Sequence, residues 1–278
     1  MKILLIANST ASSVTARKRV VIAKLLSGAH DVSVALTERR GHATELARAA
    51  IVDGVDIVVA LGGDGTLNEV ANGLVGSDCA LAVLPGGSTN VLARTLGLAD
   101  DPVQACLQLL DALDLGLIRR VSLGRVDALT PLEPGSDLGG RGPASTITEA
   151  PRWFTFHLGI GWDAATVAEV ERRGALKRYL NHVLFIYAGL TAFFRDTDRT
   201  SPWLRVDVDG EIVEGWQCLV LNSNPYTYVG SRPFDVDPQA TLDALSLVTP
   251  GPQRPRRPEP GRRSRRRRGV PAWLRGGR

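Results

Sequence analysis

The chain has 278 residues, of which 44% are hydrophobic and 22% charged, which is enough for one large or two moderate cores. Its three cysteines form no disulfide or zinc pattern, and no apolar run reaches the ~20 residues that span a bilayer, so a secreted disulfide scaffold and an integral membrane protein are both disfavoured. Residues 250–278 hold eleven arginines and one glutamate, which gives this segment a charge of +10. Because the whole chain has a net charge of +4, residues 1–249 carry a charge of −6. A folded body of this acidic charge predicts no nucleic-acid partner.

Residues 1–125 alternate between short apolar strands and helical segments. Strands are predicted over Lys2–Ala7, Asp31–Thr37, Val55–Leu61 and Ala80–Leu84. Helices are predicted over Thr15–Leu26, Thr44–Asp53, Leu67–Leu74, Val91–Leu96 and Asp101–Leu113. This alternation is typical of a doubly wound α/β domain with a parallel sheet.

The third predicted strand runs into a glycine-rich turn, Leu61-Gly62-Gly63-Asp64-Gly65-Thr66, that opens a helical segment. Glycine lets backbone N–H groups converge, and a helix N-terminus adds partial positive charge. The turn therefore suits a polyphosphate ligand.

A second glycine-rich turn, Pro85-Gly86-Gly87-Ser88-Thr89-Asn90, follows the fourth predicted strand. Its hydroxyl and amide side chains are good helix caps and can also contact phosphate oxygens. Since both turns come at the carboxyl ends of parallel strands, we expect them on the same edge of the sheet. Two ordinary strand-to-helix turns are the alternative, but turn geometry alone requires neither the Asp nor the Ser-Thr-Asn.

The remaining chain has a different character. Residues 127–151 are rich in Pro, Gly and Ser and are predicted to form a long surface loop. Antiparallel strands are predicted over Trp153–Leu158, Trp203–Val208, Glu211–Glu214 and Trp216–Asn222, with a hairpin turn at Asp209-Gly210 and a helical stretch over 164–194. We expect domains at 1–125 and 126–249. Residues 250–278 are expected to be a disordered tail that either binds anionic lipid headgroups or nucleic acid, or has no selected role.

Together the two turns resemble the catalytic domain of the diacylglycerol kinase family, which includes sphingosine and ceramide kinases. Further matching pieces lie at residues 37–43, 159–164, 222–225 and 238–243. The resemblance implies a nucleotide-binding domain followed by a mostly antiparallel β-sandwich domain, with the active site in the cleft between them. It also implies an ATP- and Mg²⁺-dependent transferase of phospholipid metabolism. We expect a cytoplasmic protein, peripheral at the inner membrane surface, with a lipid substrate there and a homodimer as an allowed assembly.

The predicted nucleotide-binding residues gather around the first turn. Backbone N–H groups of its glycines would hold the phosphates, with side-chain donors from Thr66 and Asn68. The resemblance adds Thr37 and Thr89, and also Asn8, after which this chain has Ser9 in place of the family's proline. The whole predicted set is Asn8, Thr37, Gly62, Gly63, Asp64, Gly65, Thr66, Leu67, Asn68 and Thr89.

Asp64 is the predicted catalytic residue. A carboxylate beside phosphates needs a metal or a proton to handle, so Asp64 is expected to hold Mg²⁺ through water or to deprotonate the acceptor hydroxyl. The alternative is that Asp64 caps the helix that follows it.

Two motifs depart from the family pattern. Leu242-Asp243-Ala244-Leu245 lacks the glycine of a structural Mg²⁺ site, which leaves Asp243 as the predicted metal ligand. The family's late Asp-Gly-Glu motif is absent, and Asp209-Gly210-Glu211 comes too early in the chain to replace it. Three hypotheses therefore stand: a lipid kinase acting on diacylglycerol or a related lipid, a soluble-substrate kinase like the NAD kinases that share the first turn, and a nucleotide-binding pseudokinase with a truncated C-terminus.

Overall fold

The structure, a computed structural model, describes residues 1–9, 11, 14–127, 129–131, 145–147, 150–161, 204–208, 210–242 and 246–248. The chain divides into two compact units, Met1–Phe156 and His157–Arg278. Three predictions lie outside the described residues: the helical stretch over 164–194, the metal ligand Asp243 and the tail over 250–278.

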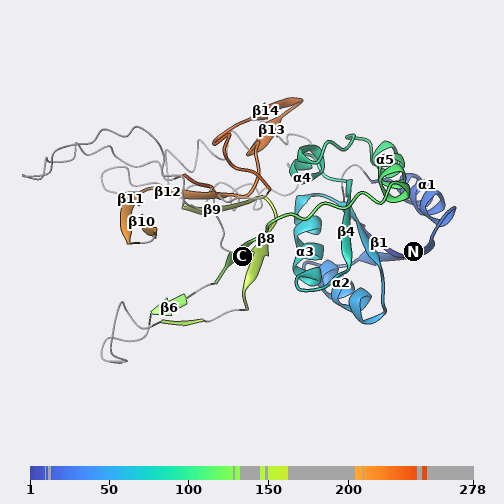
Figure 1. The fold of residues 1–278 in the computed structure, drawn as a ribbon, viewed down its shortest axis with the longest axis horizontal. Helices are drawn as coiled ribbons and strands as arrows, with labels where there is room; N and C mark the ends of the chain where they lie inside the picture. The colour runs from blue at the N-terminus through green and yellow to red at the C-terminus, as the bar shows by residue number, and fades with distance from the viewer. Residues whose placement is uncertain are drawn as a thin grey trace, which may run out of the picture. The chain divides into compact units, whose positions relative to one another are not determined.

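The first unit is built on a four-stranded parallel sheet (Figure 1). Its strands are β1 (Lys2–Asn8), β2 (Asp31–Thr37), β3 (Ile57–Gly62) and β4 (Ala80–Pro85), in the order β2-β1-β3-β4. The chain runs from β1 outward to β2 and then crosses back past β1 to β3. The winding direction therefore changes between β1 and β3, and open α/β sheets bind ligands at the carboxyl ends of the strands at such a point.

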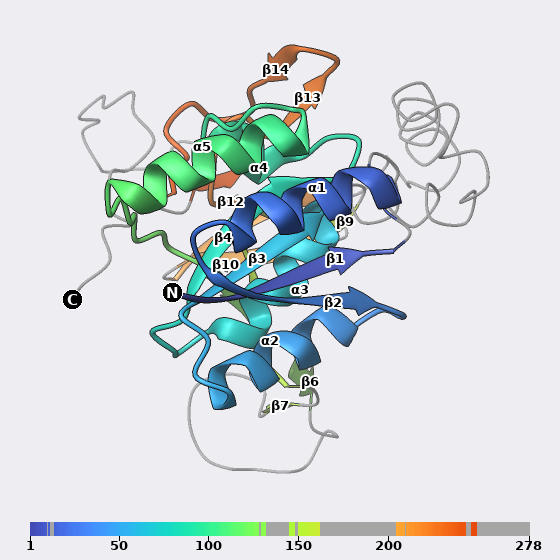
Figure 2. The same cartoon turned by 90° about the vertical axis from the view of Figure 1, so that its right-hand side faces the viewer.

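Helices cover both faces of this sheet, as Figure 2 shows. On one face α1 (Ala16–Ser27) packs beside α5 (Pro102–Asp114), and on the other α2 (His42–Val52) packs beside α3 (Asp64–Leu74). The short α4 (Val91–Thr95) follows the second glycine-rich turn. The predicted doubly wound α/β fold is confirmed for this unit.

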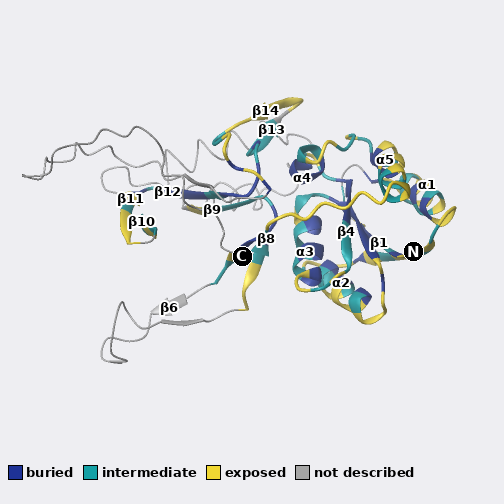
Figure 3. Cartoon of the chain, in the orientation of Figure 1, coloured by how far each residue is buried: buried dark blue, intermediate teal, exposed yellow. Residues whose placement is uncertain are grey.

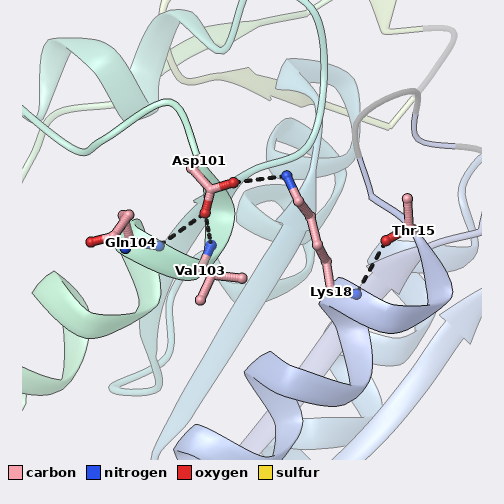
Figure 4. Close-up of polar contacts among 5 residues, drawn as sticks. All are labelled: Thr15, Lys18, Asp101, Val103 and Gln104. Carbon is pink, nitrogen blue, oxygen red and sulfur yellow. Dashed lines mark hydrogen bonds and ion pairs between the residues drawn. The ribbon is translucent and has the colours of Figure 1, made fainter.

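Asp101 joins the start of α5 to the start of α1. Its carboxylate accepts the N–H groups of Val103 and Gln104 and binds Nζ of Lys18 at 2.8 Å (Figure 4). Thr15 caps α1 through the N–H of Lys18. Both α1 and α5 thus begin at a side chain that accepts backbone N–H groups that would otherwise be unpaired.

The inner strands β1, β3 and β4 are largely buried, as the dark blue parts of the sheet in Figure 3 show, whereas the edge strand β2 is mostly exposed. All six residues of β3 are buried because alternate side chains enter opposite cores. The core toward α1 and α5 includes Ile3, Leu5, Ile22, Leu26, Val59, Leu61, Ala105 and Cys106. Toward the other face, Gly73 allows α3 to approach α2, since a Cβ there would lie 2.5 Å from Cβ of Ala47.

Every strand and helix predicted within residues 1–125 is present, with ends displaced by at most three residues. The largest displacement concerns α3, which begins at Asp64 and not at Leu67. The predicted loop over 127–151 was wrong in part, because β6 (Leu129–Pro131) and β7 (Ser145–Ile147) pair within it as antiparallel strands. Composition marks turn residues but carries no information about such pairing.

The first unit also extends beyond the expected boundary at residue 125. β5 (Gly124–Val126) pairs with β8 (Arg152–Phe154), and β8 contacts α3. Residues up to Phe156 therefore join the α/β unit.

The second unit is antiparallel in its described part. β9 (His157–Gly161), β12 (Gln217–Leu221) and β15 (Ser246–Val248) form one sheet in the order β15-β12-β9. β10 (Leu204–Val208) pairs with β11 (Glu211–Gly215), and β13 (Thr227–Val229) pairs with β14 (Arg232–Phe234). The predicted hairpin is confirmed, with Gly210 at φ 88° in the left-handed region. Among the residues described in either unit, no helix is long and apolar enough to cross a membrane.

Candidate functional site

The two glycine-rich turns lie side by side at the carboxyl edge of the parallel sheet. Gly62 is in register with Pro85, and the N–H of Gly86 donates to the carbonyl of Gly62 at 2.8 Å. A Cβ on Gly86 would lie 2.8 Å from Cα of Gly62, and one on Gly87 would lie 2.7 Å from Cα of Gly63. The two backbones therefore touch, which only glycine permits, and the predicted placement of both turns on one edge is confirmed.

The N-terminus of α3 opens at this edge without a side-chain cap. Its N-cap residue is Gly63, and the first N–H bonded within the helix is that of Leu67, which donates to the carbonyl of Gly63 at 3.1 Å. Gly65 is exposed, and an added Cβ there would meet nothing within 4 Å. Packing does not require glycine at this position, whereas close approach of a phosphate to the helix end would.

Asn8 and Thr37 reach the same edge from the ends of β1 and β2, where they are partners in register. The side-chain amide of Asn8 donates to Oγ1 of Thr66 at 2.8 Å, which joins the end of β1 to the first turn of α3. Ser9, which stands where the family has proline, donates its hydroxyl to the carbonyl of Thr37 at 2.8 Å. These predicted residues are thus assembled at the point where the winding direction changes.

The second turn is closed by Asn90, a residue that the sequence indicated only as a capping type. Asn90 adopts the left-handed conformation (φ 50°), which asparagine tolerates better than most residues. Its side chain accepts the N–H of Gly87 at 2.8 Å and donates to the carbonyl of Gly87 at 3.0 Å. Thr89 lies half-buried within this closed turn.

Asp64 connects the first turn to the second. Burial raises the pKa of its carboxyl group, and backbone N–H bonds from Asp64 itself and, at the other turn, from Val91, Leu92 and Asn90 oppose that rise. The latter three donors belong to the start of α4, so Asp64 caps α4. The capping alternative named the helix that follows Asp64, which is α3. There Asp64 is the first helical residue, and its carboxyl group bonds to its own N–H, while the other three donors belong to α4.

Leu67 and Asn68, both predicted nucleotide contacts, have other partners. The N–H of Leu67 is used within α3 and its side chain is buried. The side chain of Asn68 bonds to the backbone of Trp153 and Thr155. The helix starts three residues earlier than expected and turns both side chains toward its neighbours, so a nucleotide contact for either residue stays a prediction.

Sequence reasoning missed two further polar residues of α3. Glu69 accepts the N–H of Ala43 at the start of α2, and Asn72 bonds to Trp153 through both atoms of its amide. Glu69 and Asn72 lie between apolar residues at helical spacing. This alternation of polar and apolar residues was the only feature of the sequence that could have indicated their positions on the helix.

A metal site is not found in the described part of the chain, where no three Asp, Glu, His or Cys side chains converge. The carboxyl group of Asp64 is already occupied by the N–H groups of α4. The described residues therefore form no metal site from protein groups alone, whereas Mg²⁺ in kinases is held by one or two carboxylates together with substrate phosphates. The phosphate-binding groups in the described residues are backbone N–H groups.

A family model of the diacylglycerol kinase catalytic domain matches residues 2–126, the segment that holds both turns and the sheet. Residues 2–126 are therefore similar to the diacylglycerol kinase catalytic domain family. A diacylglycerol kinase of Bacillus subtilis strain 168 is 37% identical over 109 residues, which cover 38% of this chain and 35% of that protein. A Klebsiella pneumoniae strain 342 protein named "Probable lipid kinase YegS-like" is 36% identical over 134 residues, which cover 46% of this chain and 42% of that one.

The matched parts thus span about a third to two fifths of these curated relatives. A solved diacylglycerol kinase from Bacillus anthracis strain Sterne superposes with a TM-score of 0.58 at 23% identity, over 90% of this chain and 73% of that one. At this identity the superposition shows a shared fold. The sequence similarity thus concerns residues 2–126, and the superposition shows the fold.

Proposed function

We propose that the protein is an ATP-dependent lipid kinase that transfers the γ-phosphate of ATP to the hydroxyl of diacylglycerol or a related lipid. The observation that carries the proposal is the uncapped N-terminus of α3, set against a second glycine-rich turn at the point where the sheet changes winding direction. The similarity of residues 2–126 to the diacylglycerol kinase catalytic domain family supports the same chemistry.

The proposed roles follow from the hydrogen bonds and protons that each group can donate or accept. Phosphoryl transfer depends mainly on positioning and on neutralising charge on the transferred group. Backbone N–H groups at the start of α3 bind nucleotide phosphates, and Thr66, oriented by Asn8, lies beside them. Thr37 and Thr89 complete the nucleotide contacts, and Asp64 takes the proton of the acceptor hydroxyl. Its raised pKa makes its carboxylate a better proton acceptor than an ordinary aspartate.

We also propose that the protein works at the inner membrane surface, where its lipid substrate lies. The segment between α5 and β5 exposes three large apolar side chains within four residues: Leu115, Leu117 and Ile118 are 73%, 64% and 81% exposed. Arg119 and Arg120 follow them directly. Exposed apolar side chains beside arginines suit an anionic bilayer surface. The antiparallel strands of the second unit are proposed to form the β-sandwich of the lipid-kinase fold.

Incubation of the full chain with labelled ATP, Mg²⁺ and separate panels of lipid alcohols, sphingoid bases and NAD tests the function. Labelled product in the organic phase is expected, and calorimetry should detect ADP binding. Product from NAD alone would replace the proposal with a soluble-substrate kinase. ADP binding without any product would indicate a pseudokinase, and no ADP binding would refute the nucleotide site itself.

A further inference from the structure

Two asparagines on α3 bind one strand through its backbone. Asn72 accepts the N–H of Trp153 at 2.9 Å and donates to the carbonyl of the same residue at 2.8 Å. Asn68 donates to that carbonyl at 3.2 Å and accepts the N–H of Thr155 at 3.1 Å. Since residues four apart share one face of a helix, both side chains lie along β8 and replace a neighbouring strand. We call this pair of asparagines the β8 clamp.

The β8 clamp and the phosphate-binding end belong to the same helix. Gly65 and Thr66 lie in the first turn of α3, and Asn68 lies in the next. A helix of eleven residues with buried Leu67, Val70 and Leu74 is a rigid element, so its start and its middle move together. Displacement of the N-terminus of α3 therefore reaches β8 through four hydrogen bonds.

β8 is also the last strand of the first unit. From Phe154 the chain passes through only Thr155 and Phe156 before β9 begins the second unit at His157. Thr155 is buried, and its N–H is one of the clamped groups. The clamp thus acts on the segment by which the α/β unit is connected to the antiparallel unit.

We propose that Asn68 and Asn72 are positioning residues, which couple nucleotide binding at the start of α3 to β8 and through it to the productive placement of the lipid acceptor. This inference rests on the proposed function. In this proposal both residues act through β8, and neither contacts nucleotide or lipid. If the clamp served stability alone, nucleotide binding would not change the hydrogen-exchange rates of the Trp153 and Thr155 amide protons.

Hydrogen exchange on the full chain, with and without ADP, tests the coupling. In the wild-type protein ADP is expected to slow exchange of the Trp153 and Thr155 amide protons. Asn72→Ala should speed exchange at Trp153 and Asn68→Ala at Thr155, because each loses its acceptor, and the response to ADP at these sites should disappear. Thr44→Val is the matched control, since it removes the hydrogen bond from Thr44 to the carbonyl of Glu69 on the α2 side of α3 and leaves β8 untouched.

Kinetics separate positioning from nucleotide contact. Both alanine variants should lower kcat with a lipid acceptor by at least about tenfold, as expected for misplaced reactants. Their ADP affinity and their KM for ATP should stay within about threefold of wild type, because the clamp does not touch the phosphate-binding end. Should an alanine variant fail to fold, Asn68→Asp and Asn72→Asp keep the acceptor oxygens and remove the donors to Trp153. The same kinetic expectations apply to these two variants.

Wild-type turnover in folded clamp variants would overturn the positioning role, and so would unchanged Trp153 and Thr155 exchange when ADP binds. A large loss of ADP affinity in Asn68→Ala would instead make Asn68 a nucleotide contact and overturn it too. If the wild-type chain binds no ADP, the proposed function fails first and the coupling fails with it.

Discussion

Gly65→Ala tests whether the start of α3 is a phosphate site. The structure leaves open space around Gly65, so an added methyl group costs nothing in the protein without nucleotide. Alanine is favoured over glycine in a helix by about 0.5–1 kcal/mol, which would raise Tm by about 1–4 °C in a unit of this size. We therefore expect a variant as stable as wild type, or slightly more stable.

Binding should change in the opposite direction. A phosphate held by the N–H groups of Gly65 and Thr66 must approach the backbone closely, and a methyl group at position 65 would displace it. Loss of one hydrogen bond to a charged group costs about 1.5–3 kcal/mol, which corresponds to about 10- to 100-fold weaker ADP binding. Isothermal calorimetry with ADP and a thermal melt of the same preparation measure both quantities.

Gly87→Ala provides the contrast. Its Cβ would lie 2.7 Å from Cα of Gly63, so the two turns would have to separate, and overpacking of this kind costs about 1–3 kcal/mol. Both variants are therefore expected to bind ADP more weakly. The Tm should fall in Gly87→Ala, whereas it should stay unchanged or rise in Gly65→Ala. Wild-type ADP affinity in Gly65→Ala would place the phosphates elsewhere and refute the proposed site.

Three further predictions follow from single side chains. Asp64→Asn keeps an oxygen for the N–H groups of α4, so we expect a folded protein whose phosphoryl transfer falls at least ~100-fold; normal turnover would leave Asp64 only its capping role. The hydrogen bond from Lys18 lowers the pKa of Asp101, so the stability that this pair adds should be full at neutral pH and lost as pH falls below about 4. Because both side chains are more than a third exposed, Asp101→Asn should cost at most ~1 kcal/mol by denaturant titration at pH 7, and an equal cost at pH 3 would contradict this. Ile118→Glu should weaken sedimentation with anionic vesicles about tenfold, whereas Val52→Glu, at an 88% exposed site on α2, should not; equal effects would exclude a specific membrane segment.

The sequence predicted the parallel sheet well because its inner strands β1, β3 and β4 are largely buried. Such strands are continuous apolar runs, and β3 is the clearest of them. The second unit was harder to predict because β13 and β14 are short and β14 is exposed along its whole length, so neither carries a strong periodic pattern. The β6–β7 pairing was missed for a related reason: its partners are separated by a Pro- and Gly-rich segment whose composition indicates only turns.

Within the site, some features could be predicted from the sequence and others could not. Glycine positions could be predicted, since turn geometry and phosphate approach both require them in a local stretch of chain. The partners of Asp64, Asn68 and Asn72 could not, because each side chain bonds to backbone more than twenty residues away.

By itself, the amino-acid sequence determined the strand-helix alternation, the two glycine-rich turns and the edge of the sheet on which they meet. These depend on hydrophobic periodicity and on local backbone freedom, which are properties of short segments. Only the tertiary structure decided that Asp64 caps α4 and that Asn68 and Asn72 hold β8. An asparagine or aspartate can bond equally well to many backbone groups, and the packing of α3 against its neighbours selects the ones within reach.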